Sequence, residues 1–271
     1  MSPMQKILLI FLSLLLITAC ASDKKKREEA EKKLEETLPP EVVAEKFYND
    51  GMDLLEGNHY QKAAQKLEKI EQDYPYSRWA ARSQVMAAFA YYQNRKYDDA
   101  NLALDHFISL HPGSDQIPYA YYLKALCYFE QITDIRRDQA VTENAKKSLQ
   151  EVIGRFPNTQ YARDAKVKLD LVNDHLAGKE MEIGRYYQKK GNYIAAINRF
   201  KEVVDHYDTT THVAEALHRL VESYLILGVE PEAQKYAAVL GHNYPASKWY
   251  QYSYELLKGK HNDVTKLPKP E

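Results

Sequence analysis

The stretch that decides the fold runs from Phe47 to Pro75 and reads FYNDGMDLLEGNHYQKAAQKLEKIEQDYP. The pair Gly57-Asn58 predicts a tight turn near its middle, and the proline predicts its end. Small and bulky apolar residues recur at helical spacing on both sides of that turn: Phe47, Gly51, Leu54, Ala63, Leu67 and Ile70. Gly51 and Ala63 predict where the two helix backbones approach closely. The stretch therefore reads as two short amphipathic helices joined by a turn.

This order of residues is typical of the tetratricopeptide repeat, a unit of two helices that ends near a proline. One such unit cannot bury its own apolar face, so it requires stacked neighbours. Pro112, Pro157 and Pro245 mark further copies along the chain. The core positions repeat as Ala88, Tyr91, Ala100, Leu104, Phe107, Tyr121, Ala125, Tyr128, Ala145, Leu149, Val152, Val221, Tyr224, Ala233, Ala237 and Leu240. We predict an all-α, right-handed solenoid of about five helix pairs.

The fourth copy is predicted to begin with an unusually long helix. Its small residues are Gly184 and Ala196, and Asp208 stands where the other copies have proline. The apolar stripe upstream keeps its phase, which predicts one helix from Thr159 to Lys190. A break at Gly178 is the alternative, because a glycine inside a helix costs about 1 kcal/mol.

The repeats also predict how the chain is divided. Residues 41–157 hold copies one to three, with a charged insertion from Gln131 to Thr142 in the third. Residues 158–257 hold copies four and five, and SKWYQYSYELL from Ser247 to Leu257 predicts a last helix that caps the stack. Residues 258–271, with their two prolines, predict a flexible tail.

The first 20 residues predict a targeting segment. Lys6 precedes an apolar run, Ile7 to Ile17, which is too short to span a bilayer. The sequence Ile-Thr-Ala-Cys that ends at Cys20 resembles a bacterial lipoprotein signal, in which small residues precede the cysteine that is lipidated. An ordinary cleaved signal peptide and an uncleaved anchor are the alternatives. Ala21, rather than aspartate, follows the cysteine, which is compatible with an outer-membrane destination.

Residues 21–40 predict a solvated tether. The segment DKKKREEAEKKLEE has almost no apolar face to bury, although its Glu/Lys pairs favour transient helix. Pro39-Pro40 ends it. Such a spacer holds a folded domain just off a membrane surface.

Composition argues for a binding protein. The chain has 271 residues, and its 37 basic and 38 acidic side chains give a net charge of -1, which disfavours nucleic acid as a partner. Phosphate-binding glycine loops, paired-cysteine metal motifs and nucleophile elbows do not occur in the sequence, so we expect no enzyme, no metal and no cofactor. Cys127 lies in a helical run and predicts a buried side chain outside any disulfide.

Two segments carry a family resemblance. The run PNTQYARDAKVKLDLVNDHLAGKEMEIGRYYQKKGNYIAAINRFKEVVDHY, at residues 157–207, and the run YPYSRWAARSQVMAAFAYYQNRKYDDA, at residues 74–100, resemble the BamD (ComL-type) family of lipoproteins. The resemblance implies a protein anchored in the outer membrane and facing the periplasm, within the β-barrel assembly machinery and beside its other lipoproteins. It also implies that the C-terminal repeats dock on the POTRA domains of BamA, and that the N-terminal repeats receive unfolded outer-membrane proteins.

Three residues of the repeats are candidate contacts. Because Phe200 takes the core position, Arg199 points away from it and is a candidate for BamA, with a solvated pair to Glu202 as the plain alternative. Tyr48 and Tyr92 lie beside core positions and are candidates for unfolded substrate. A different function stays open, that of a tetratricopeptide lipoprotein that coordinates peptidoglycan enzymes at the cell wall.

Overall fold

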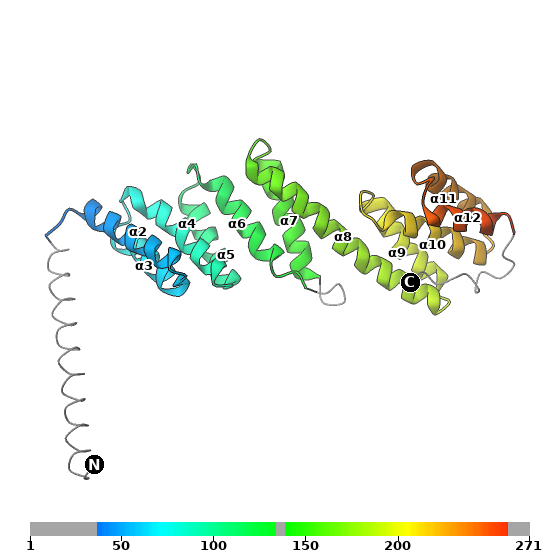
Figure 1. Cartoon of the computed structure of the whole chain (residues 1–271), viewed down its shortest axis with the longest axis horizontal. Helices are drawn as coiled ribbons and strands as arrows, with labels where there is room; N and C mark the ends of the chain where they lie inside the picture. The colour runs from blue at the N-terminus through cyan, green and yellow to red at the C-terminus, as the bar shows by residue number, and fades with distance from the viewer. Residues whose placement is uncertain (1–36, 134–138, 260–271) are drawn as a thin grey trace, which may run out of the picture. The chain divides into compact units, whose positions relative to one another are not determined.

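The computed structural model describes residues 37–133 and 139–259 (Figure 1), and in these residues every regular element is an α-helix. The helices are α2 (Pro40–Glu56), α3 (Tyr60–Asp73), α4 (Arg78–Gln93), α5 (Tyr97–Leu110), α6 (Ile117–Phe129), α7 (Ala140–Arg155), α8 (Gln160–Lys189), α9 (Tyr193–His206), α10 (Val213–Ile226), α11 (Glu230–Asn243) and α12 (Lys248–Leu257). Helices α2 to α11 form the five predicted pairs, and α12 follows as the predicted last helix. The all-α prediction is confirmed.

The chain divides into two compact units, one up to Ser114 with α2 to α5 and one from Asp115 with α6 to α12. Within each unit every helix packs on the next one along the chain. First helices of neighbouring pairs also contact each other: α2 contacts α4, and α6 contacts α8. This is the packing expected of stacked helix pairs. The grouping predicted from the repeats, 41–157 and 158–257, stays a prediction.

The predicted close approaches of helices are present. A Cβ atom added to Gly51 would lie 2.7 Å from Cγ and Cδ2 of Leu67, and one added to Gly184 would lie 2.4 Å from Cε1 of Phe200. Ala63, Ala100 and Ala196 are fully buried. Small residues thus occupy the helix crossings, and the bulky side chains of the partner helices fill the space that they leave.

Four of the turns inside the pairs share one backbone feature. In the first, second, fourth and fifth pairs the turn has a residue in the left-handed region: Asn58 at φ 60°, Arg95 at 57°, Gly191 at 77° and Gly228 at 73°. In the first pair Gly57 itself has φ −74°, so Asn58 takes the left-handed position of the predicted Gly57-Asn58 turn. Asparagine tolerates this region better than most residues do.

The prolines lie in the turns that follow the second helices of the pairs, and these turns share their capping residues. The second helix of every pair is followed by an aromatic or histidine C-cap: Tyr74, His111, Phe156, Tyr207 and Tyr244. Three of the next helices begin at a hydroxyl N-cap, since Ser77, Thr159 and Ser247 accept a hydrogen bond from a backbone N–H of the first turn. Asp208 replaces proline in the fourth copy, and there Thr210 Oγ1 donates to the carbonyl of Tyr207 at 2.8 Å. The turn therefore persists without the proline.

Helix α8 is continuous, so the predicted long helix is confirmed and the alternative break at Gly178 does not occur. Its 30 residues bury Ala162, Ala165, Val172 and Leu176 along one face. Gly178 has a packing reason, because a Cβ atom there would lie 3.2 Å from Nε2 of His212 in the turn before α10. The glycine lets the imidazole approach the helix backbone.

The core of the second unit extends along all of its helix pairs. Leu149, Met181, Phe200, Leu217 and Leu240 are fully buried in it. Cys127 of α6 is fully buried, as predicted. Helix α12 closes the end of this unit by packing on α10 and α11.

Candidate functional site

The candidate lipidation site, Cys20, lies outside the described residues, as does the tether up to residue 36. In the described part of the chain, none of the helices is long and apolar enough to cross a membrane.

Tyr48, a candidate substrate contact, lies on α2 and is half-buried. Its ring packs on Trp79 of α4, with ring centroids 4.7 Å apart. The two rings join the small core that α2, α3 and α4 share around Leu67 and Ile70. Tyr48 is therefore partly exposed, and much of its surface is used for packing.

Tyr92, the second candidate, lies near the end of α4 and is also half-buried. Its ring centroid lies 5.9 Å from that of Tyr97 on α5 and 6.3 Å from that of Phe89. Its neighbour Tyr91 is buried, as predicted for the core member of the pair. Tyr48 and Tyr92 thus lie on the first helices of the first two repeats and belong to two separate aromatic groups.

Arg199 lies on α9 with its side chain 44% exposed, so its outward direction is as predicted. Its ion-pair partner is not Glu202, the residue of the alternative interpretation. Nη1 lies 3.0 Å from Oε2 of Glu180 on α8, whereas Glu202 faces His206, with Nε2 to Oε2 at 3.8 Å. The pairing with Glu202 is therefore wrong. The packing of α9 along α8 brings Glu180 within reach, and helical spacing inside α9 could not reveal that contact.

A buried polar cluster on α10 was not anticipated. His218, 2% exposed, places Nδ1 2.9 Å from Oγ of Ser253 on α12 and Nε2 3.5 Å from Oε1 of Glu222. Arg219 donates through Nη1 to the other oxygen of Glu222 at 2.8 Å. Burial alone would raise the pKa of Glu222, but the hydrogen bond and charge of His218, with the guanidinium of Arg219, hold it below its usual range.

The cluster links three helices. From α8, Gln188 Nε2 donates to Glu222 Oε2 at 3.2 Å, and Arg185 Nη1 lies 3.3 Å from Glu215. From α12, Trp249 lies under the guanidinium of Arg219, which is 5.5 Å from the ring. Spacings of three and four within HRLVE were the signal available in the sequence, since they place Glu222 within reach of both His218 and Arg219. These contacts join α12 and α8 to α10 and stabilise the end of the second unit.

Residues 37–133 and 139–259 contain no group of three or more His, Cys, Asp or Glu side chains placed to hold a metal ion. Helices α2 to α11 form pairs that carry exposed polar and aromatic side chains. This arrangement suits the binding of other proteins, and it defines a helical-repeat protein of the tetratricopeptide class.

Within that class, the chain belongs to the family described as YfiO, outer membrane lipoprotein, which matches residues 40–240. It is similar to proteins named outer membrane protein assembly factor BamD. The one from Rickettsia prowazekii (strain Madrid E) is 52% identical over 79% of this chain and 86% of its own length. The one from Caulobacter vibrioides is 49% identical over 79% of this chain and 70% of its own length. One from Neisseria meningitidis serogroup A is 34% identical over 78% of this chain and 83% of its own length. The family resemblance predicted from the sequence is confirmed.

Proposed function

We propose that this protein is a scaffold subunit of the outer-membrane β-barrel assembly machinery and performs no catalysis of its own. The observation that carries the proposal is an identity of about one half, over most of both chains, to relatives named assembly factor BamD. A stack of helix pairs supports it, because such stacks present extended surfaces to other polypeptides.

The proposal includes a lipid anchor at Cys20 and a fold that faces the periplasm. The family description, outer membrane lipoprotein, supports membrane attachment. A diacylglyceryl group together with an amide-linked acyl chain holds a protein far more firmly than one chain does. The charged residues that follow Cys20 then act as a spacer between the membrane and α2.

The second unit is proposed to dock on the POTRA domains of BamA through Arg199. The Arg199 side chain is 44% exposed, whereas that of Glu180 is 18% exposed, so Arg199 is proposed to keep Glu180 and share its guanidinium with a partner. Sharing is feasible because a guanidinium has five N–H donors. Arginine offers a forked donor that suits such a contact.

The first unit is proposed to receive unfolded outer-membrane proteins at Tyr48 and Tyr92. Each ring is half-buried and already packed against aromatic neighbours, so its position is restricted before a substrate arrives. A preorganised aromatic edge contributes contact area with little loss of side-chain entropy.

The cell-wall alternative has less support, because the relatives reported above are named assembly factors. The experiment that separates the two functions is depletion of the protein in its own bacterium. The expected result is a loss of folded β-barrel proteins from the outer membrane before peptidoglycan cross-linking changes. An early change in peptidoglycan with normal levels of folded barrels would reject the assembly function.

A further inference from the structure

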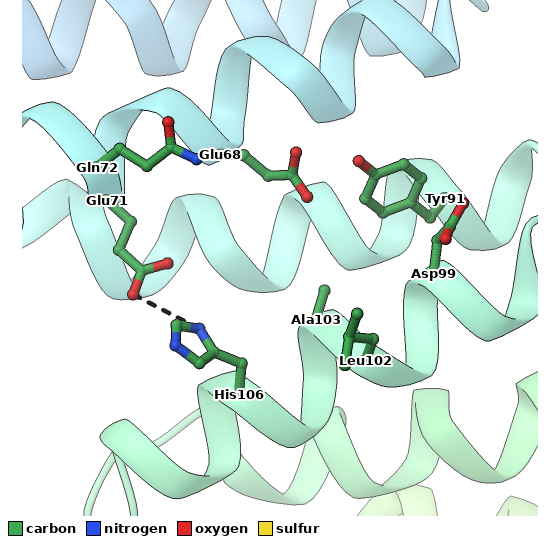
Figure 2. A pocket seen from close by; sticks show the side chains of 8 residues that line it. All are labelled: Glu68, Glu71, Gln72, Tyr91, Asp99, Leu102, Ala103 and His106. Atoms are coloured by element: carbon green, nitrogen blue, oxygen red, sulfur yellow. Dashed lines mark ion pairs between the residues drawn. The ribbon is translucent and has the colours of Figure 1, made fainter.

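The first unit contains a hollow of about 600 Å³ that the functions above do not use. Figure 2 shows it between α3 and α5, with α4 behind. Its lining residues are Glu68, Glu71 and Gln72 of α3, Tyr91 of α4, and Asp99, Leu102, Ala103 and His106 of α5. We name this hollow the α3–α5 groove. Its volume lies within the range of about 300–1,000 Å³ found for ligand pockets.

Negative charge lines both walls of the α3–α5 groove. Glu68 and Glu71 come from α3, and Asp99 comes from α5. Figure 2 shows Glu71 beside His106 at one end of the groove, Asp99 beside Tyr91 at the other, and Glu68 between them. His106 is the basic side chain of the lining, and its Nδ1 lies 3.6 Å from Oε1 of Glu71. Lys96, outside the lining, reaches Asp99 at 3.8 Å. Three carboxylates against one imidazole leave the groove with an excess of negative charge whether or not His106 is protonated.

The floor of the groove holds one of these carboxylates in place. Tyr91 is 9% exposed and shares a hydrogen bond with Glu68. Burial, followed by the hydrogen bond and charge of Glu68, raises the pKa of the tyrosine hydroxyl. The hydroxyl therefore remains a donor at neutral pH, and it fixes the orientation of the carboxylate while leaving other lone pairs of that carboxylate able to accept.

An apolar surface lies beside the carboxylates. Leu102 is 73% exposed, although the opposite face of the same helix buries Ala100, Leu104 and Phe107. Ala103 continues this surface into the groove. A wall that combines an exposed aliphatic side chain with carboxylates matches the side chains of lysine and arginine, in which an aliphatic stem carries a cationic end.

We propose that the α3–α5 groove binds an arginine or lysine side chain of a partner polypeptide, with its stem on Leu102 and its cationic end at Glu68 and Asp99, the two carboxylates near Tyr91. The same charges disfavour a carboxylate, including the C-terminal carboxylate of an unfolded chain. The α3–α5 groove is built mainly by second helices of the repeats, whereas Tyr48 and Tyr92 lie on first helices. The inference is therefore independent of the substrate surface proposed above.

The test uses the lipidated full chain in detergent and a fluorescein-labelled, C-terminally amidated peptide of repeated Gly-Leu-Arg units. Binding is followed by fluorescence anisotropy. The double variant Glu68→Gln with Asp99→Asn removes the two charges proposed to hold the cationic end. Its matched control, Glu202→Gln with Asp208→Asn, removes two charges of the second unit at exposed positions. A peptide with glutamine in place of arginine reports the contribution of the cation.

The expected result is that the groove variant binds the arginine peptide about tenfold more weakly than the control variant does, because charge-assisted hydrogen bonds are lost. Leu102→Ser is expected to weaken binding as well, and the glutamine peptide is expected not to bind. Equal weakening by both double variants would overturn the proposal, because the peptide would then be attracted by the net negative charge of the protein and not by the groove. Tighter peptide binding after Lys24, Lys25, Lys26 and Arg27 are all changed to glutamine would also overturn it, because the chain's own basic run would then be the occupant.

Discussion

Two glycines of α8 respond to the same substitution in opposite ways. In Gly184→Ala, the new methyl group would lie 2.4, 2.8 and 2.9 Å from three ring carbons of Phe200. Phe200 is fully buried, so its ring has no free space to move into. In Gly178→Ala, the new methyl group would lie 3.2 Å from Nε2 of His212, whose side chain is 27% exposed. That imidazole can shift by a few tenths of an ångström toward solvent.

The balance of two effects sets the size of each change. At Gly184, overpacking lowers the free energy of unfolding by about 3 kcal/mol, and the higher helix propensity of alanine restores about 1 kcal/mol. The net loss of stability is about 2 kcal/mol. A loss of this size lowers the melting temperature of a domain of this length by about 4–8 °C. At Gly178 the same propensity gain of about 1 kcal/mol meets only a mild contact, so the substitution is expected to be neutral or stabilising.

The assay is thermal unfolding of both variants and the parent chain, followed by circular dichroism at the helical minimum. Each protein is expressed without residues 1–20, so that the comparison takes place in water. Gly184→Ala is expected to melt below the parent and Gly178→Ala at or above it. A melting temperature of Gly184→Ala equal to that of Gly178→Ala would refute the close crossing of α8 and α9.

Four further predictions concern single sites. Arg199→Glu is expected to weaken binding of the isolated POTRA region of BamA about tenfold in a titration, at unchanged helicity. An unchanged dissociation constant would show that Arg199 does not contact BamA. Cys20→Ser is expected to leave the protein in the soluble fraction or as an uncleaved precursor, because the acyl anchor is lost; its recovery from outer membranes that lack BamA would exclude the anchor. Photocrosslinkers at Tyr48 and Tyr92 are expected to capture unfolded outer-membrane protein, whereas capture at α9 to α11 alone would reverse the assignment. The folded-state pKa of Glu222 is lowered, so this group stabilises the fold at neutral pH and loses that contribution as pH falls through the folded-state pKa. In denaturant unfolding, the parent should therefore have a larger free energy of unfolding than Glu222→Gln at neutral pH, and the difference should shrink in acid. A difference that does not change with pH would contradict the lowered pKa of Glu222.

The sequence was informative about the fold because repeat cores rest on local periodicity. Gly51, Ala63, Ala100 and Ala196 all lie at buried helix crossings, where their spacing predicted them. The phase of the apolar stripe also predicted a continuous α8. The reason for Gly178 was not available from the sequence, because His212 approaches it from a different helix pair.

The candidate surfaces were less accessible to sequence reasoning. Arg199 was correctly directed outward, but its partner Glu180 comes from the neighbouring helix and not from α9. The α3–α5 groove needs side chains of α3, α4 and α5 at one place, and no local pattern in any of these helices reports that meeting. The contact of His218 with Ser253 could not be predicted for a similar reason, since Ser253 lies on α12.

The most direct test of the proposed assembly function is to isolate the lipidated protein from outer membranes in mild detergent and to identify what accompanies it by mass spectrometry. A tagged lipoprotein of unrelated fold, purified from the same membranes, is the control for non-specific recovery. BamA is expected to copurify in near-equal amount with this protein and to be absent from the control. Recovery of peptidoglycan synthases in place of BamA would contradict the assembly function.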